Sequence, residues 1–172
     1  LCNFDLLPFV QAVRLEKSGK KRRTMVRAIR ASDHYAVLNP TYVDFALGSF
    51  LKGTAVLEEG TNANNVNATA TAELVNTQSF DGVQLSKGSI TLKVRGTQIE
   101  VVSGSVDMVY RDVAKGQLNL AASANYRKFN GNGKATLNEG LVWGDIKVKS
   151  GSIDVDLADN KVVTAQGQMK MG

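Results

Sequence analysis

From Thr54 to the end of the chain, apolar and polar residues alternate with a period of two, and Gly, Ser, Asn or Asp interrupts the alternation every eight to twelve residues. Successive side chains of a strand point to opposite faces of a sheet, so this pattern predicts strands with one buried and one solvated face. The predicted strands are 54–57, 68–75, 82–85, 89–94, 98–102, 105–110, 116–122, 133–137, 144–149, 152–157, 161–166 and 168–171. We therefore expect a mainly β fold of many short antiparallel strands, arranged as a sandwich, a barrel or a curved, solenoid-like sheet.

A fourteen-residue pattern occurs twice within this region. Residues 99–112 read IEVVSGSVDMVYRD and residues 146–159 read IKVKSGSIDVDLAD, with seven identical positions, and VQLSKGSITLKV at 83–94 is a weaker third copy. Each copy has apolar residues at alternate positions on either side of a Gly-Ser pair, which is typical of a tight turn or a bulge in a two-stranded unit. We expect Gly88, Gly104 and Gly151 to be structural turns. Their spacings of 16 and 47 residues differ, so a strict solenoid is not indicated.

The residues before Thr54 show a different, helical spacing. The apolar residues of TYVDFALGSFLKG that fit one helical face are Val43, Ala46, Leu47, Phe50 and Leu51. Thr41 is a candidate N-cap and Gly53 a candidate terminator, so we expect a helix at about 42–52. A second short, basic helix is indicated at 24–31, although its alternation would also suit a strand.

The net charge of +5 is concentrated at the start of the chain. Residues 1–30 hold eight Lys or Arg against two acidic residues, whereas the rest holds 13 basic and 14 acidic residues. A basic block of this kind serves anionic partners, nucleic acid or anionic lipid, or is a solvated leader. We expect residues 14–30 to make such contacts, through Lys20, Lys21, Arg22, Arg23, Arg27 and Arg30.

At 172 residues the chain is long enough for one domain with a sizeable core. We divide it into a basic N-terminal arm, residues 1–30, and a single β-rich domain, residues 31–172, that includes the helix at 42–52. No run of eighteen apolar residues is present, so no transmembrane helix is predicted. Residues 1–12 are apolar enough to be the remnant of a processed leader, although Asp5 and Pro8 interrupt the run.

The sequence offers no catalytic, cofactor or metal motif, so we expect a protein that is not an enzyme. Its single cysteine, Cys2, and single histidine, His34, have no recognisable context for a nucleophilic pair and are too few for a Cys/His metal site. Asp154 and Asp156 resemble a calcium loop only superficially, and we interpret them as part of an exposed polar strand face. GNGK at 131–134 is interpreted as a hairpin turn, and Trp143 as a packing or interface anchor. No small-molecule substrate is indicated.

The charge partition, the many strands and the missing catalytic groups favour a structural subunit. In this hypothesis a β-rich body associates with copies of itself or with other structural subunits, as in a virion shell or tail, and the basic arm contacts an anionic partner. Unpaired strand edges would favour such self-association.

The segment VQLSKGSITLKVRGTQIEVVSGSVDM, followed by QLNLAA, resembles the repeated strand-glycine-strand pattern of the AsmA/TamB family of bacterial envelope proteins. The resemblance covers residues 83–122, with a weaker similarity at 141–171. It implies a curved sheet with an apolar inner groove, a place in the periplasm or cell envelope, and a role in lipid transport or outer-membrane assembly. Family members are usually far longer, and no functional residue of the family matches a position here.

Overall fold

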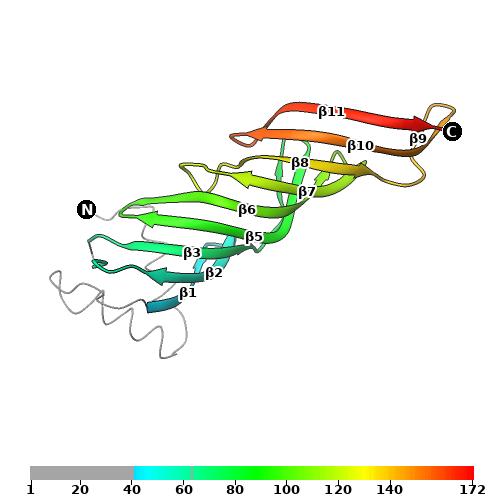
Figure 1. Ribbon diagram of the computed structural model, residues 1–172. Helices are drawn as coiled ribbons and strands as arrows, with labels where there is room; N and C mark the ends of the chain where they lie inside the picture. Colours follow the sequence, from blue (N-terminus) through cyan, green and yellow to red (C-terminus); the bar gives the residue numbers. More distant parts are fainter. Residues whose placement is uncertain (1–40, 63) are drawn as a thin grey trace.

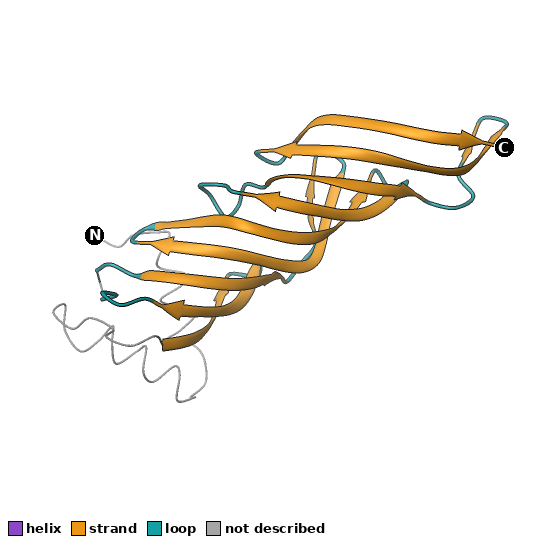
Figure 2. Cartoon of the chain, in the orientation of Figure 1, coloured by secondary structure: helices purple, strands orange, loops and turns teal. Residues whose placement is uncertain are grey.

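The computed structural model describes residues 41–62 and 64–172, which form strands and loops (Figure 2). The strands are β1 (Thr41–Leu47), β2 (Leu51–Leu57), β3 (Asn67–Leu74), β4 (Gln78–Phe80), β5 (Val83–Arg95), β6 (Gln98–Tyr110), β7 (Ala114–Ala121), β8 (Asn130–Leu137), β9 (Val142–Trp143), β10 (Ile146–Ala158) and β11 (Lys161–Met171). The predicted mainly β fold is confirmed. The helix predicted at 24–31 lies outside the described residues.

The strands form one antiparallel sheet that largely follows chain order. Its order is β1-β2-β3-β5-β6-β7-β8-β10-β11, with β4 paired to β5 and β9 paired to β10. Figure 1 shows this order, from β1 at the lower left to β11 towards the upper right. The sheet therefore grows by adding each hairpin to the one before it, and all its strand pairs are antiparallel, as predicted.

The two faces of the sheet differ in polarity. On one face, which we call the inner face, a row of paired residues crosses the whole sheet and contains only apolar residues and glycines: Phe45, Gly53, Ala72, Ile90, Gly104, Leu120, Gly131, Leu157 and Val162. A neighbouring row on the outer face is polar: Lys52, Glu73, Ser89, Ser105, Asn119, Asn132, Asp156 and Thr164. The period of two in the sequence produces this division directly.

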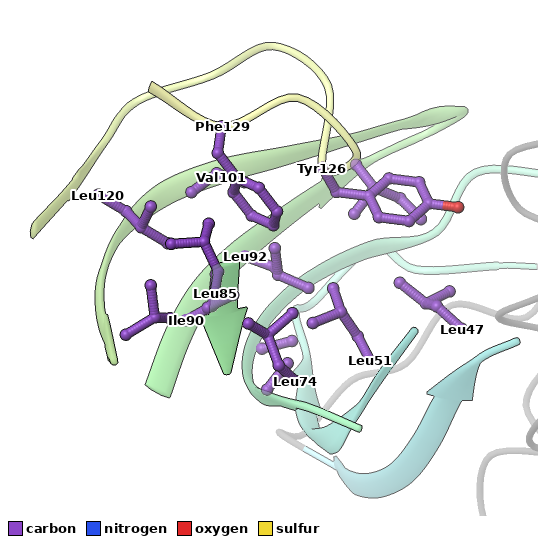
Figure 3. Close-up of a cluster of buried hydrophobic side chains, with 14 of the residues drawn as sticks. Leu47, Leu51, Leu74, Leu85, Ile90, Leu92, Val101, Leu120, Tyr126 and Phe129 are labelled. Carbon is purple, nitrogen blue, oxygen red and sulfur yellow. The ribbon is translucent and has the colours of Figure 1, made fainter. Parts of the chain in front are cut away.

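The inner face of β1 to β8 is a packed core. Figure 3 shows Leu51 of β2, Leu74 of β3 and three residues of β5, Leu85, Ile90 and Leu92, pointing into one common volume, and all five are buried. Burying a side chain of this size stabilises the fold by about 1.5–3 kcal/mol relative to leaving it exposed. Side chains of the neighbouring strands β2, β3 and β5 thus pack together over the inner face.

Aromatic side chains cover one part of this core. Phe129, in the connection between β7 and β8, lies with its ring centroid 5.9 Å from that of Phe50 in the β1–β2 turn and 5.9 Å from that of Phe80 in β4. Tyr126 lies 6.1 Å from Phe50. The backbone N–H of Phe129 donates to Oδ1 of Asn160 in the β10–β11 turn, at 2.7 Å. The connection therefore ties the first, middle and last hairpins to one another.

The predicted helix at 42–52 is wrong, because these residues form the β1–β2 hairpin. Val43, Phe45 and Leu47 lie at every second position and are buried, so residues that fit part of a helical stripe also fit a strand. Gly48 has a φ of +58°, which allows the chain to reverse. Pairing of β2 with β3 supplies hydrogen-bond partners that a local helical pattern cannot foresee.

The prediction of turns at Gly88, Gly104 and Gly151 is also wrong, because each lies inside a thirteen-residue strand. The alternative of a bulge applies at Gly88, which follows the register shift at Lys87 and has a φ of +146°. At Gly104 an added Cβ would lie 2.7 Å from the carbonyl oxygen of Ser89. Six of the predicted short strands are therefore halves of three long ones, β5, β6 and β10.

The predicted hairpin turn at 131–134 lies inside β8 and is wrong as well. Gly131 and Gly133 face the backbone of β7, where a side chain on either would overlap a carbonyl oxygen. Glycine is used here for close approach between strands, which has the same sequence signal as a turn. The C-terminal strands 161–166 and 168–171 likewise form one strand, β11.

Candidate functional site

The residues predicted to contact an anionic partner lie outside the described residues. This applies to the whole segment 14–30, and so to Lys20, Lys21, Arg22, Arg23, Arg27 and Arg30. Cys2 and His34 also lie outside the described residues. The candidate site must therefore be sought on the sheet itself.

The outer face carries polar groups that do not form a reactive centre. Asp154 and Asp156 are exposed on β10, as predicted, and Oδ1 of Asp154 lies 3.9 Å from Nζ of the exposed Lys134. Across residues 41–62 and 64–172, no group of three or more His, Cys, Asp or Glu side chains could hold a metal ion. The interpretation of these carboxylates as part of a polar strand face is confirmed.

A hollow on the sheet near β1, β2 and β3 is lined by Asp44, Lys52, Thr54, Thr71 and Glu73, among others. Oγ1 of Thr54 donates a hydrogen bond to Oδ1 of Asp44, at 3.0 Å. The charges have mixed sign, and the two acids and the lysine are accessible to solvent. The hollow is therefore a solvated part of the polar outer face.

The inner face continues onto β9, the start of β10 and the end of β11, where most of its apolar side chains are exposed. Met169 pairs with Gly151 and Met171 with Val148, while Ile146 pairs with Trp143. An extra residue in β10, between Val148 and Ser150, keeps these pairs on one face. We call this set the open stripe: Trp143, Ile146, Val148, Met169 and Met171. Trp143 is 73% exposed and Met171 63% exposed.

The open stripe lies beside an unpaired strand edge. Among the described residues β11 pairs with β10 alone, so its other edge presents backbone N–H and C=O groups. The start of this edge is an exception, because the N–H of Val162 donates to Oδ2 of Asp81 in the β4–β5 turn, at 2.9 Å. We call the remaining residues, 163–171, the free edge. Exposed edges of this kind accept further strands.

Most residues of the open stripe were not singled out by the sequence. Trp143 was predicted as a packing or interface anchor, and the structure places it on the exposed strand β9, with no aromatic ring beside it among the described residues. Met169 and Met171 belonged to a predicted strand, but alternation does not say which strand ends a sheet.

Comparison with known proteins identifies no relative. Neither a family model, nor a curated protein, nor a solved structure matches the chain. The described residues contain no helix long and apolar enough to cross a membrane.

Proposed function

We propose that this chain is a non-enzymatic structural or assembly subunit whose β body joins a neighbouring subunit at the free edge and the open stripe. The observation that carries the proposal is the coincidence of the two features. The same few strands leave both their backbone hydrogen-bonding groups and their apolar inner side chains exposed. A second strand placed there would satisfy the backbone groups and cover apolar area at the same time.

A contact at the open stripe would remove apolar side chains from water. Transfer of apolar surface from water contributes about 25 cal/mol per Å². Trp143, Ile146, Met169 and Met171 are all more than two-fifths exposed and lie on one face. Scattered exposed apolar residues are normal, but a stripe beside an unpaired edge is typical of an interface.

The basic arm adds a second contact to this proposal. Residues 1–30 carry a net charge of +6 by sequence, and an arm of that charge would neutralise phosphates without regard to base sequence. A shell- or tail-like subunit uses both parts, the sheet for its neighbours and the arm for nucleic acid or another anionic partner. Arm contacts would weaken with salt, whereas sheet contacts would persist.

The experiment is light scattering of the full chain over a range of protein concentrations at two salt concentrations. We expect the weight-average mass to rise with protein concentration at both salts, because the sheet contact is largely apolar. Retention of a short nucleic acid duplex should be lost at high salt and on replacing the six basic residues of 20–30 by Gln. A stable monomer at every concentration would contradict the assembly role.

A second candidate function is supported by the open stripe itself. An apolar inner face with exposed lysines at the same end, Lys147, Lys149 and Lys170, suits the acyl chain and anionic headgroup of a lipid. This is the role that the AsmA/TamB resemblance implies. Solvent extraction of the purified chain tests it: co-purifying lipid that is lost in Trp143→Ala would support the lipid role, and protein free of lipid would oppose it.

A further inference from the structure

The length and position of the free edge restrict how a strand can pair with it. The N–H of Val162 is already bonded to Asp81, so the available segment begins at Val163 and ends with the strand at Met171. This segment has nine residues, and its midpoint is Gly167. An antiparallel partner strand that uses its full length is therefore centred on Gly167.

The inner and outer faces impose a second restriction. Ala165 and Gly167 are opposite Val155 and Ile153 of β10, so odd-numbered residues from 165 to 171 lie on the inner face. A partner that continues the sheet must place its own inner residues opposite these, because a shift by one residue would exchange the faces. Pairing of β11 with itself about Gly167 meets this condition.

The side chains brought together by that pairing are compatible. Gly167 of one copy lies opposite Gly167 of the other, Ala165 opposite Met169, Gln166 opposite Gln168, Thr164 opposite Lys170 and Val163 opposite Met171. Lys170 is the single charged residue of the free edge, and it meets a neutral hydroxyl. No like charges oppose one another, and the exposed apolar residues meet apolar ones.

Gly167 has further properties that suit a two-fold axis. An added Cβ there would approach no atom closer than 3.4 Å, so the position is not a glycine for lack of room within its own sheet. Without a side chain it leaves space on the inner face, where Met169 of each copy can lie across the axis. Met is flexible enough to fill such a space.

We propose that two copies of this chain join by antiparallel pairing of their β11 strands about Gly167, which makes one sheet continuous across a two-fold axis. The proposal rests on the proposed assembly function and specifies its partner and register. The contact is isologous, so it closes at two copies. Because a single strand pair buries less than the roughly 1,200 Å² of a stable interface, the dimer forms at high protein concentration and dissociates on dilution.

Changing the charge at positions 164 and 170 tests the register, because the two-fold axis places these two residues opposite each other twice. Thr164→Lys places one lysine opposite each of the two Lys170 side chains of the dimer, and should weaken dimerisation about tenfold. Thr164→Glu should strengthen it, and Thr164→Lys combined with Lys170→Glu should restore it. Thr71→Lys, at an exposed outer-face position on β3, is the control and should leave the dimer unchanged.

Light scattering gives the dimerisation constant, and thermal unfolding confirms that each variant is folded. Cross-linking in a Cys2→Ser background adds a second readout: Gly167→Cys should form a disulfide dimer, whereas Gln166→Cys and Gln168→Cys should not, since their Cα atoms would lie beyond the roughly 7 Å limit for a disulfide. Two results would overturn the proposed register and leave the assembly function intact: a dimerisation constant that does not change with the charges at positions 164 and 170, or a disulfide dimer of Gln168→Cys in place of Gly167→Cys. A chain that stays monomeric would contradict both the assembly function and the β11 pairing. A chain that pairs only with a strand of another protein would show that its partner is not a second copy.

Discussion

The two copies of the repeated fourteen-residue pattern have different surroundings in the same sheet. Ile99 and Val101 of the first copy, in β6, are 3% and 2% exposed, whereas Ile146, at the matching position of the second copy in β10, is 43% exposed. Val148, which matches Val101, is half-buried. The residue types and the strand pattern are the same. What differs is how much of the rest of the molecule packs over each copy. The repeat therefore determines which side chains lie on the inner face, and other segments determine whether they are buried.

The covering of the first copy comes from distant segments. The β7–β8 connection pairs its Ser123 with Val101, and the backbone N–H of Tyr126 donates to the carbonyl oxygen of Ile99, at 3.0 Å. At the second copy the N–H of Val148 donates to the carbonyl oxygen of Leu141 in the β8–β9 connection, at 2.9 Å, but Ile146 stays 43% exposed. The inner face is thus a core at β1 to β8 and at the end of β10, where Val155 and Leu157 are buried, and an open surface at β9, at the start of β10 and along β11 from residue 163 onwards.

Truncating Phe129, in the β7–β8 connection that covers the core, should give the largest loss of stability. Phe129→Ala deletes a fully buried ring that contacts Phe50 and Phe80, and we expect it to lower the free energy of unfolding by about 3–5 kcal/mol. Trp143→Ala removes a larger ring from the open stripe, and should change the stability of the monomer by no more than about 0.5 kcal/mol. Urea unfolding at low protein concentration measures both. Equal losses would mean that the two regions are covered alike.

Truncation of the matching isoleucines tests the same contrast within the repeat. Ile99→Ala should cost about 2–5 kcal/mol, because a buried side chain leaves a cavity. Ile146→Ala should cost well under half of that, since water already reaches the side chain. Urea unfolding of the pair under identical conditions is the measurement, and an Ile146 variant as unstable as the Ile99 variant would show that the open stripe is in fact packed.

Glycine substitutions distinguish crowded from open positions of the inner face. Gly104→Ala brings a methyl group within 3.1 Å of the Ile90 Cα and closer to a carbonyl oxygen, and should destabilise by about 1–3 kcal/mol. Gly167→Ala meets nothing closer than 3.4 Å and should be neutral or stabilise by about 0.5 kcal/mol, through lower entropy of the unfolded chain. Thermal unfolding compares the two variants. A destabilised Gly167→Ala monomer would place a neighbour over this position.

A local effect should come from the side chain of Asp81, which accepts a hydrogen bond from the start of β11. Asp81→Ala removes the acceptor of the Val162 N–H, and should cost about 1 kcal/mol while the amide of Val162 exchanges with solvent faster. Asp81→Asn keeps an acceptor oxygen and a residue that tolerates the φ of +51°, and is the matched control. Unchanged exchange at Val162 in the alanine variant would show that this hydrogen bond does not close the edge.

The sequence predicted the strands better than their limits. Alternation missed the short strands β4 and β9 but placed the other strands from 54 onwards, because it reports a local property, the face on which each side chain lies. It divided β5, β6 and β10 at their glycines, because a glycine that allows a bend or a close approach, as at Gly104, has the same appearance as one in a turn. It assigned 42–52 to a helix, because Val43 and Leu47 fit both periods and the deciding contact, pairing with β3, is not local.

The candidate site was less predictable, for the same reason. Met169 and Met171 have the alternation of any buried strand, and only the absence of a further pairing among the described strands leaves them exposed. The capping of Val162 by Asp81 joins residues 81 positions apart in the chain. Which strand lies at an edge, and which of its backbone groups other segments hydrogen-bond, depends on the whole sheet. A local segment of sequence therefore does not predict it.

Hydrogen exchange of β11 at increasing protein concentration shows whether copies of the chain join at the free edge. If the free edge is where copies join, the amides of residues 163–171 that point away from β10 should be unprotected in dilute protein and become protected as concentration rises. The amides of the central strands β3 and β5 should be protected equally throughout. Protection of β11 that does not depend on concentration would contradict the account.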